Sequence, residues 1–316
     1  MRALSLGPDG PAFTRDQPAP DRPGEARIAL RLGGVCATDL ELCRGYMGFQ
    51  GVLGHEFVGE VLQAPDRCLV GRRVVGEINA ACGTCPSCRA GRPTHCPHRT
   101  VLGIQGRDGA FADELCLPVG NLHVVPEGVP DEAAVFVEPL AAACRILEQV
   151  HVRPGDRVIV LGLGRLGQLC ARVLALTGAQ VSGVARSPQK LGLLPRSVQA
   201  VPLAQVQDLE LADLVVDCTG APEGLRLASS RVRPGGTLVL KTTVHLPEPL
   251  SPTPWVIDEI TVIGSRCGPF APALRLLAAG RVEPRDLVTA RYPLEQGVEA
   301  LRRAGEAGSV KVLLGP

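Results

Sequence analysis

One stretch of the chain decides its fold: Val158-Ile159-Val160-Leu161-Gly162-Leu163-Gly164-Arg165-Leu166-Gly167. Apolar residues of the kind found in strands lead into glycines at the spacing Gly-x-Gly-x-x-Gly, and a helix-like run from Gln168 to Leu176 follows. Alone this spacing is a weak signal, but between a strand and a helix it is a fingerprint of dinucleotide binding. Gly162 permits a tight turn, Gly164 lets a pyrophosphate approach the backbone, and Gly167 allows close packing of helix on sheet. The alternative is a glycine turn in an α/β fold that binds no ligand.

The chain on either side of this stretch predicts two kinds of domain. From Ala26 to about Val125, short apolar runs are broken by Gly and Pro, which indicates an irregular β domain. Helical periodicity begins near Asp131, and from Arg157 to about Gly264 short β-branched runs alternate with helix-like or turn segments. This alternation is typical of a parallel sheet with crossover helices. The expected strands are 158–161, 181–184, 214–216, 237–240, 260–263 and 309–314, and a late helix is expected over 273–280.

The residues after the second of these strands indicate which dinucleotide binds. An NAD site would place Asp or Glu about twenty residues beyond the glycines, to bind the ribose 2′-hydroxyl. This chain has Ala185 there, followed by Arg186 and Ser187. Arg186 can pair with a 2′-phosphate and Ser187 can hydrogen-bond it, so NADP is favoured over NAD. The alternative is that Arg186 only stacks on the adenine ring.

Cysteine spacing predicts a metal site. Cys82, Cys85, Cys88 and Cys96 follow one another at close spacing on a backbone rich in Gly and Pro. Four thiolates can enclose a tetrahedral zinc ion and leave no open position, which makes such a site structural. The polar segment 89–95 argues against the alternative of four core cysteines, and an iron–sulfur cluster is the remaining alternative.

A third set of residues is spread along the chain. It consists of Cys36 followed by Thr38-Asp39, of Gly54-His55-Glu56, and of Glu138 before a proline. Cys36, His55 and a carboxylate would give zinc three protein ligands and one open position, which is the arrangement of catalytic zinc.

In this combination and order, the motifs resemble those of the zinc-dependent alcohol dehydrogenases of the medium-chain dehydrogenase/reductase superfamily, from about Ala26 to the end of the chain. The resemblance implies an α/β architecture in two domains. A GroES-like β catalytic domain with a structural zinc lobe would cover 1–138 and 268–316. A Rossmann domain with a doubly wound parallel sheet would cover 139–267, with the active site in the cleft between the two.

The resemblance also implies roles for the residues of the metal site. Cys36, His55 and Glu138 would bind the catalytic zinc, and Glu56 would be a neighbouring carboxylate that can replace water on the metal. A Glu at the third ligand position looks like the polyol, sugar and threonine dehydrogenase branches more than the vertebrate alcohol dehydrogenases.

Two residues beside the metal would assist catalysis. Thr38 would contact the substrate oxygen and begin a proton relay, and Asp39 would accept the other ring N–H of His55. Many relatives have His five residues after the first zinc ligand, where this chain has Glu41, so the end of the relay stays open.

For the cofactor, the resemblance implies contacts from the glycine loop, from the strand-end turn 217–220 on the nicotinamide side, and from a basic residue near the phosphates. The expected residues are Gly162, Gly164, Arg165, Leu166, Gly167, Arg186, Ser187, Thr219 and Lys311. The segment between Lys190 and Asp213 is shorter than usual, and we expect the nucleotide domain to lack part of a helix there.

Composition excludes several classes of partner. The 316 residues include 33 basic and 32 acidic ones, so there is no electrostatic reason to expect nucleic acid or an acidic membrane surface. The N-terminus has no secretory signal and no segment reaches the length of a membrane span, so a cytoplasmic protein is expected. The substrate would be a small alcohol or carbonyl compound, and the resemblance implies a homodimer or homotetramer. The alternatives are an NAD-dependent polyol or amino-alcohol dehydrogenase and a nucleotide-binding redox sensor.

Overall fold

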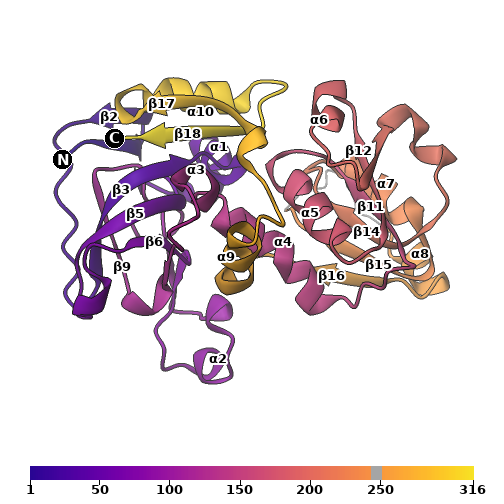
Figure 1. The fold of residues 1–316 in the computed structure, drawn as a ribbon, viewed down its shortest axis with the longest axis horizontal. Coiled ribbons are helices and arrows are strands. Elements are labelled where there is room, and N and C mark those ends of the chain that lie inside the picture. Colours follow the sequence, from indigo (N-terminus) through magenta and orange to yellow (C-terminus); the bar gives the residue numbers. More distant parts are fainter. Residues whose placement is uncertain (243–250) are drawn as a thin grey trace. The chain divides into compact units, whose positions relative to one another are not determined.

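The computed structural model describes residues 1–242 and 251–316. The chain divides into two units, each described by itself: unit 1 is Met1–Glu138 with Leu274–Pro316, and unit 2 is Pro139–Ala273 (Figure 1). Within the described residues, no helix has the length and apolar character needed to cross a membrane.

Unit 1 is built on strands that pair antiparallel, except that β17 and β18 are parallel to each other. A seven-stranded sheet has the order β10-β6-β5-β3-β18-β17, with β9 also pairing β3, and smaller sheets are formed by β2-β1-β4 and β7-β8. The strands are β1 (Ala3–Gly7), β2 (Gly10–Thr14), β3 (Ala26–Gly34), β4 (Gly51–Val52), β5 (Glu56–Gln63), β6 (Arg73–Gly76), β7 (Asn79–Ala80), β8 (Thr100–Val101), β9 (Glu114–Leu117), β10 (Leu122–Val124), β17 (Val288–Pro293) and β18 (Lys311–Gly315).

Helices in unit 1 are short and lie between these strands. The α-helices are α1 (Ala37–Cys43), α2 (Pro86–Arg89), α3 (Asp131–Ala134) and α10 (Gly297–Gly305), with α9 (Phe270–Ala278) crossing the boundary between the units. The 3-10 helices are η1 (Tyr46–Gly48), η2 (Arg67–Leu69), η3 (Pro93–His95), η4 (Val119–Asn121), η6 (Arg285–Leu287) and η7 (Leu294–Gln296).

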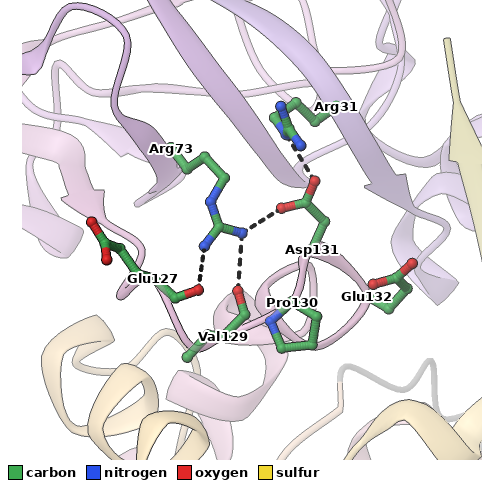
Figure 2. A pocket seen from close by; sticks show the side chains of 7 residues that line it. All are labelled: Arg31, Arg73, Glu127, Val129, Pro130, Asp131 and Glu132. Carbon is green, nitrogen blue, oxygen red and sulfur yellow. Dashed lines mark hydrogen bonds and ion pairs between the residues drawn. The ribbon is translucent and has the colours of Figure 1, made fainter.

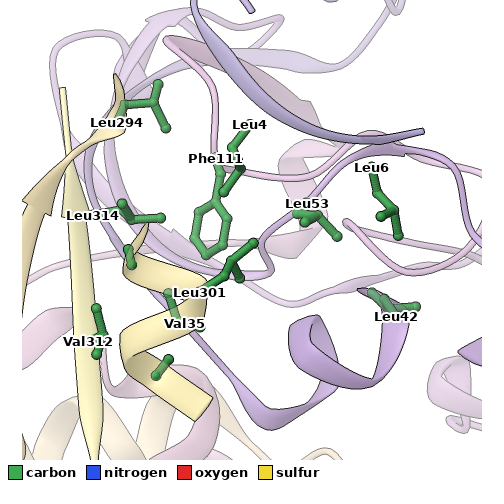
Figure 3. Close-up of a cluster of buried hydrophobic side chains, with 12 residues drawn as sticks. Leu4, Leu6, Val35, Leu42, Leu53, Phe111, Leu294, Leu301, Val312 and Leu314 are labelled. Carbon is green, nitrogen blue, oxygen red and sulfur yellow. The ribbon is translucent and has the colours of Figure 1, made fainter. Parts of the chain in front are cut away.

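The core of unit 1 joins the two ends of the chain. Leu4 from β1, Phe111 and Leu314 from β18 are fully buried in one cluster (Figure 3). The ring of Phe111 leaves no room beside it: a Cβ on Gly54 would lie 2.4 Å from its Cδ1 atom, and the φ of Gly54 is +94°. A glycine is therefore required directly before His55.

An ion-pair network fixes α3 to the sheet of unit 1. The carboxylate of Asp131 accepts hydrogen bonds from Arg31 Nε on β3 (2.8 Å) and from Arg73 Nη1 on β6 (2.7 Å) (Figure 2). Arg73 also donates to the backbone carbonyl of Val129 at 2.9 Å. Both guanidinium groups already bind Asp131, so we interpret the shallow pocket of Figure 2 as a structural ion-pair network rather than a ligand site.

Unit 2 is a doubly wound parallel sheet. Its six strands are all parallel and have the order β13-β12-β11-β14-β15-β16, which is the strand order of the Rossmann fold. The strand order reverses its direction along the sheet between β11 and β14. Helix α5 packs on β11 and β12, and α7 packs on β14 and β15. The elements are α4 (Val137–Gln149, crossing the boundary), β11 (Arg157–Leu161), α5 (Arg165–Ala175), β12 (Gln180–Ala185), α6 (Pro188–Gly192), β13 (Val198–Pro202), η5 (Leu203–Asp208), β14 (Ala212–Asp217), α7 (Pro222–Arg231), β15 (Val232–Leu240), α8 (Thr253–Ile257) and β16 (Thr261–Gly264).

The sequence missed one strand of this sheet. Strand β13 has the sequence Val-Gln-Ala-Val-Pro, in which only Val198 and Val201 are buried, so it lacks the continuous apolar run of its neighbours. After β13 the chain forms only the 3-10 helix η5. This is the segment in which the sequence predicts that part of a helix is missing.

Candidate active site and metal sites

Cys36, His55 and Glu56 form a group in unit 1. Cys36 is the N-cap of α1, His55 directly precedes β5, and Glu56 is the first residue of that strand. Their potential ligand atoms all lie within 4.8 Å of one another. His55 and Glu56 are buried and Cys36 is half-buried. The group therefore lies mostly below the surface, and Cys36 is its most solvent-accessible residue.

Asp39 connects two members of this group. Its Oδ2 atom accepts a hydrogen bond from the backbone N–H of Cys36 at 2.8 Å, which closes the first turn of α1. Its Oδ1 atom lies 3.2 Å from Nδ1 of His55, and neither atom has a further partner among the described residues. Asp39 thus fixes the backbone of Cys36 and faces the ring of His55 at once.

The two carboxylate oxygens of Glu56 have different surroundings. Oε2 forms an ion pair with Nζ of Lys311, and both side chains are buried. Oε1 is buried without a hydrogen-bond partner among the described residues. Leaving a buried carboxylate oxygen unpaired is costly unless a ligand satisfies it.

The charges around His55 favour the protonated form of its imidazole ring. Burial acts to lower the pKa of His55, but the charges of Asp39 and Cys36 outweigh it and raise that pKa well above its usual value. A thiol, an imidazole and a carboxylate with an unsatisfied oxygen form a donor set suited to zinc. These residues therefore fit a zinc ion.

Glu138 and Thr38 do not belong to the group formed by Cys36, His55 and Glu56. Glu138 is half-buried in the first turn of α4 and does not join the group, so its role as a third metal ligand stays a prediction. Thr38 is half-buried in the first turn of α1, with Oγ1 3.8 Å from Sγ of Cys36.

The four expected cysteines converge on one point. Sγ of Cys85 lies 3.5 Å from Sγ of Cys88 and 3.8 Å from Sγ of Cys96, and Sγ of Cys96 lies 3.5 Å from Sγ of Cys82. Four sulfurs at about 2.3 Å from a tetrahedral zinc ion would be about 3.8 Å apart, so these separations fit zinc.

The pKa values of the thiols in this lobe depend on the neighbouring sulfurs and backbone N–H groups. Backbone N–H groups of Thr84 and Cys85 donate to the sulfur of Cys82 and lower its pKa to about 5, which favours the thiolate. Burial and the neighbouring sulfurs of Cys85 and Cys96 raise the pKa of Cys88 to about 12. Because cysteine binds zinc as the thiolate, a zinc ion bound by these four sulfurs would displace the protons that the thiols still carry.

The glycine loop of unit 2 has the form expected for a dinucleotide. Gly162 has a φ of +87°, and a Cβ on Gly167 would lie 1.8 Å from the carbonyl oxygen of Gly162. A Cβ on Gly164 would meet nothing within 4 Å. Gly164 is the N-cap of α5, whose first residues are Arg165 and Leu166, so the open side of the loop faces a helix N-terminus.

Comparisons with known proteins agree with both units. The family model for the alcohol dehydrogenase GroES-like domain matches residues 22–127, and that for zinc-binding dehydrogenases matches residues 166–279. A sorbitol dehydrogenase of Halalkalibacterium halodurans is 30% identical over all of this chain and 99% of its own length. The chain belongs to the zinc-dependent alcohol dehydrogenases of the medium-chain dehydrogenase/reductase superfamily.

Further relatives agree with this assignment. The L-galactonate-5-dehydrogenase of Escherichia coli is 29% identical, with 88% of this chain and 87% of the relative covered. A solved zinc-binding dehydrogenase from Sinorhizobium meliloti 1021, bound to NADP, superposes with a TM-score of 0.91 at 27% identity and covers 100% of this chain and 99% of its own. The protein is therefore an oxidoreductase that acts on an alcohol with zinc and a nicotinamide cofactor, and its fold is a GroES-like domain with a Rossmann domain, as the motifs predicted.

Positive side chains gather beside the glycine loop of this dehydrogenase. Arg186 is exposed directly after β12, and Ser187 caps α6 by accepting from the backbone N–H of Lys190 at 3.4 Å. Burial, then the charges of Arg165 and Arg186, lower the pKa of Lys190. The charges of Arg165 and Arg186 therefore both act on Lys190, and an anion bound there would relieve this repulsion.

Sequence reasoning missed Lys190 as part of this cluster. Its position three residues after Ser187, within the first turn of a helix, was the available signal. The backbone carbonyl of Lys190 accepts a hydrogen bond from Nε2 of the buried Gln168 at 2.6 Å, which holds α6 against α5.

Two other expected cofactor residues lie in different places. Thr219 follows β14, where its backbone N–H (2.9 Å) and its hydroxyl (2.7 Å) both donate to Oδ1 of Asp217. Lys311 is fully buried in unit 1 and paired with Glu56. Its contact with the cofactor phosphates stays a prediction.

Proposed function

We propose that this dehydrogenase uses NADP in preference to NAD and transfers hydride between that cofactor and a primary or secondary alcohol. The observation that carries the cofactor preference is the cluster of Arg165, Arg186 and Lys190 at the end of β12. Strand β12 ends in Ala185, so no carboxylate stands at that position to repel a 2′-phosphate. Arginine is suited to a phosphate because its fork of N–H groups can donate two hydrogen bonds at once.

The metal assignments form the second part of the proposal. Cys36, His55 and Glu138 hold the catalytic zinc, and Glu56 supplies a further carboxylate oxygen beside it. Support for Glu56 comes from its buried and unpartnered Oε1 atom. Cys82, Cys85, Cys88 and Cys96 hold the structural zinc, which their sulfur separations support.

The chain's own residues prepare the site for proton and hydride transfer. When bound, zinc supplies a Lewis acid that favours loss of the alcohol proton, and the oxidised nicotinamide supplies a hydride acceptor. Thr38 Oγ1, near Sγ of Cys36, accepts the proton of the substrate hydroxyl as it donates its own hydroxyl proton toward the cofactor ribose and solvent. Asp39 holds the backbone of Cys36 and orients the ring of His55. At the position where many relatives have His, this chain has Glu41, which pairs with Arg44 at the surface, so the end of the proton path is not assigned.

For the substrate class, we propose a polyol or a sugar-like alcohol. The relatives named for sorbitol and L-galactonate support this class. A panel of polyols, sugars, aromatic alcohols and aliphatic alcohols, each assayed with both cofactors, tests it. Oxidation of simple aliphatic or aromatic alcohols alone would contradict it. We also propose a homodimer or homotetramer, which light scattering of the purified enzyme measures.

The cofactor preference is tested on kcat/KM for NADP and NAD with one good substrate. We expect Arg186→Ala to lower kcat/KM for NADP at least tenfold while leaving the value for NAD within about threefold, since a lost charge-assisted contact is worth about 1.5–3 kcal/mol. Arg196→Ala removes another exposed arginine of unit 2 and is the matched control. Equal losses for both cofactors, or a wild-type preference for NAD, would reject the proposal.

A metal analysis tests the zinc assignments. We expect two zinc ions per chain in the wild type and one in Cys36→Ser, with alcohol oxidation abolished and cofactor binding retained. One zinc in the wild type would favour the redox-sensor alternative, and full activity of Cys36→Ser would reject the zinc mechanism.

A further inference from the structure

Lys311 is the first residue of β18, and its side chain is completely buried. Its Nζ atom forms an ion pair with Oε2 of Glu56 and lies 3.5 Å from the carbonyl oxygen of Val35. It also lies 5.3 Å from the centre of the Phe136 ring, within the range of a cation–π interaction. The ammonium group therefore has three contacts, and each comes from a different segment of unit 1.

Each contact partner lies within two residues of a proposed ligand of the metal site. Val35 directly precedes Cys36, and Glu56 directly follows His55. Phe136 is fully buried just before α4, whose first turn contains Glu138. A single side chain thus touches all three segments that carry the proposed ligands of the catalytic zinc.

The strand around Lys311 does not require this charge. The backbone N–H of Val35 donates to the carbonyl of Val312 at 2.9 Å, and β18 pairs with β3 in the register Leu313 to Gly34. An apolar side chain at position 311 would keep these bonds and avoid the unfavourable desolvation of an ammonium group. The charge is therefore explained by its partners rather than by the sheet.

The pairing also determines how Glu56 is presented. With Oε2 held by Lys311, only Oε1 is left, and that atom is buried without a partner among the described residues. Gly34 leaves the space for this carboxylate, because a Cβ there would lie 2.7 Å from Oε2. Loss of the ammonium group would free the carboxylate to rotate and leave its charge unbalanced.

We propose that Lys311 is a positioning residue of the catalytic zinc site, which acts by fixing the segments of Cys36, His55 and Glu138 relative to one another. The inference rests on the proposed function, since it requires a zinc ion at that site. It gives Lys311 a task inside unit 1 that differs from contact with the cofactor phosphates.

The test compares Lys311→Met with Lys311→Arg in the full-length enzyme. Zinc per chain is measured after dialysis against a chelator, and Co²⁺ is then introduced so that its visible spectrum reports the geometry of the catalytic site. We expect Lys311→Met to keep the structural zinc, to bind the second ion at least tenfold more weakly, and to show a changed cobalt spectrum. Lys311→Arg keeps the charge and should restore most of the affinity.

A matched control is the second buried lysine, Lys241 in unit 2, whose Nζ donates to the carbonyl of Ala142 at 2.7 Å and to Oγ of Ser265 at 3.1 Å. Lys241→Met removes a buried ammonium group as well, but we expect both zinc ions and an unchanged cobalt spectrum. Two ions of unchanged affinity and an unchanged spectrum in Lys311→Met would overturn the inference alone. One zinc in the wild type would overturn the proposed function and the inference together.

A second variant covers the case in which Lys311→Met does not fold. Lys311→Met with Glu56→Gln leaves no unbalanced buried charge, and Glu56→Gln alone is its reference. Because the contacts to Val35 and Phe136 are still lost, we expect the double variant to bind Co²⁺ at the catalytic site at least tenfold more weakly than the reference. Equal affinity in the two would overturn the inference.

Discussion

The Oδ1 atom of Asp39 lies 3.2 Å from the Nδ1 atom of His55, and both side chains are almost completely buried. Asp39 also accepts from the backbone N–H of Cys36, so its removal disturbs two proposed ligands. We expect Asp39→Ala to weaken zinc binding at the catalytic site 10- to 100-fold and to lower kcat, because partners that orient a metal-binding histidine typically have effects of this size. Zinc retention against a chelator and kcat measure it.

The control for this variant is Asp66→Ala, which removes another carboxylate that accepts from a backbone N–H at a helix start, that of Cys68 at the surface. It should leave zinc content unchanged. Unaltered zinc retention in Asp39→Ala would contradict the proposed role of Asp39.

The four-cysteine lobe predicts a different result, a loss of stability. Cys85 is buried among the other three sulfurs, and metal binding in such a lobe contributes directly to folding. We expect Cys85→Ser to hold one zinc ion fewer per chain and to have a lower Tm. Cys116→Ser changes a buried cysteine outside both metal groups, and it should retain the full zinc content. An unchanged Tm and zinc content in Cys85→Ser would reject a structural zinc.

Gly34 offers a way to disturb Glu56 without removing it. A Cβ at position 34 would lie 2.7 Å from Oε2 of Glu56 and 3.3 Å from Cγ2 of Val135, so Gly34→Ala must displace the carboxylate. We expect at least a tenfold loss of kcat/KM together with weaker zinc binding. Gly7→Ala is the matched change on a strand, since a Cβ there meets nothing within 4 Å, and its activity should equal that of the wild type.

Much of this site follows from local patterns in the sequence. The spacing of the cysteines and the glycine fingerprint are local because the chemistry that they predict requires neighbouring residues. In the structure, the ligand atoms of the four cysteines lie within 4.8 Å of one another, and Gly162 has a φ of +87°. The five strands expected around the fingerprint are all present. Strands β11, β12, β14 and β15 lie inside the sheet and contain apolar runs that are buried for much of their length. Strand β16 is an exposed edge strand, and its β-branched residues revealed it. Helix 273–280 is found as α9 (Phe270–Ala278).

The remaining features depend on contacts between distant residues. Strand β13 lies at an edge with exposed polar side chains, so its sequence has no apolar run to reveal it. Lys311 is 255 residues from Glu56, and nothing near either residue indicates that they pair. A lysine is usually exposed, so its burial is decided by the sheet that brings β18 beside β3.

The ion pairs of Asp131 with Arg31 and Arg73 in Figure 2 predict that stability depends on pH. Burial acts to raise the pKa of Asp131, but hydrogen bonds from Arg31 and Arg73 hold it below its usual value. A carboxyl whose pKa is lowered by folding stabilises the native state above the pKa of the unfolded chain, and this contribution is lost as the pH falls through the folded pKa. We expect Asp131→Asn to lose about 1 kcal/mol at pH 7, a value reduced for partial exposure, and to approach the wild type as the pH falls below about 4.

The measurement is the Tm of both proteins between pH 7 and pH 3 with zinc present throughout. Asp9→Asn changes an exposed carboxylate in the turn between β1 and β2 and serves as control. A Tm difference between Asp131→Asn and the wild type that stayed constant over this range would show that the charge of Asp131 does not stabilise the fold.

The glycine loop allows cofactor binding as a whole to be separated from the choice between NADP and NAD. A Cβ on Gly167 would lie 1.8 Å from the carbonyl oxygen of Gly162, so Gly167→Ala must move α5 away from the loop. Both cofactors share the pyrophosphate, and we therefore expect at least tenfold weaker binding of NADPH and of NADH, measured by fluorescence titration. Gly192→Ala, where a Cβ meets nothing within 4 Å, should bind both normally. A selective loss of NADPH alone in Gly167→Ala would show that the loop does not hold the pyrophosphate, because selectivity is expected only from Arg186.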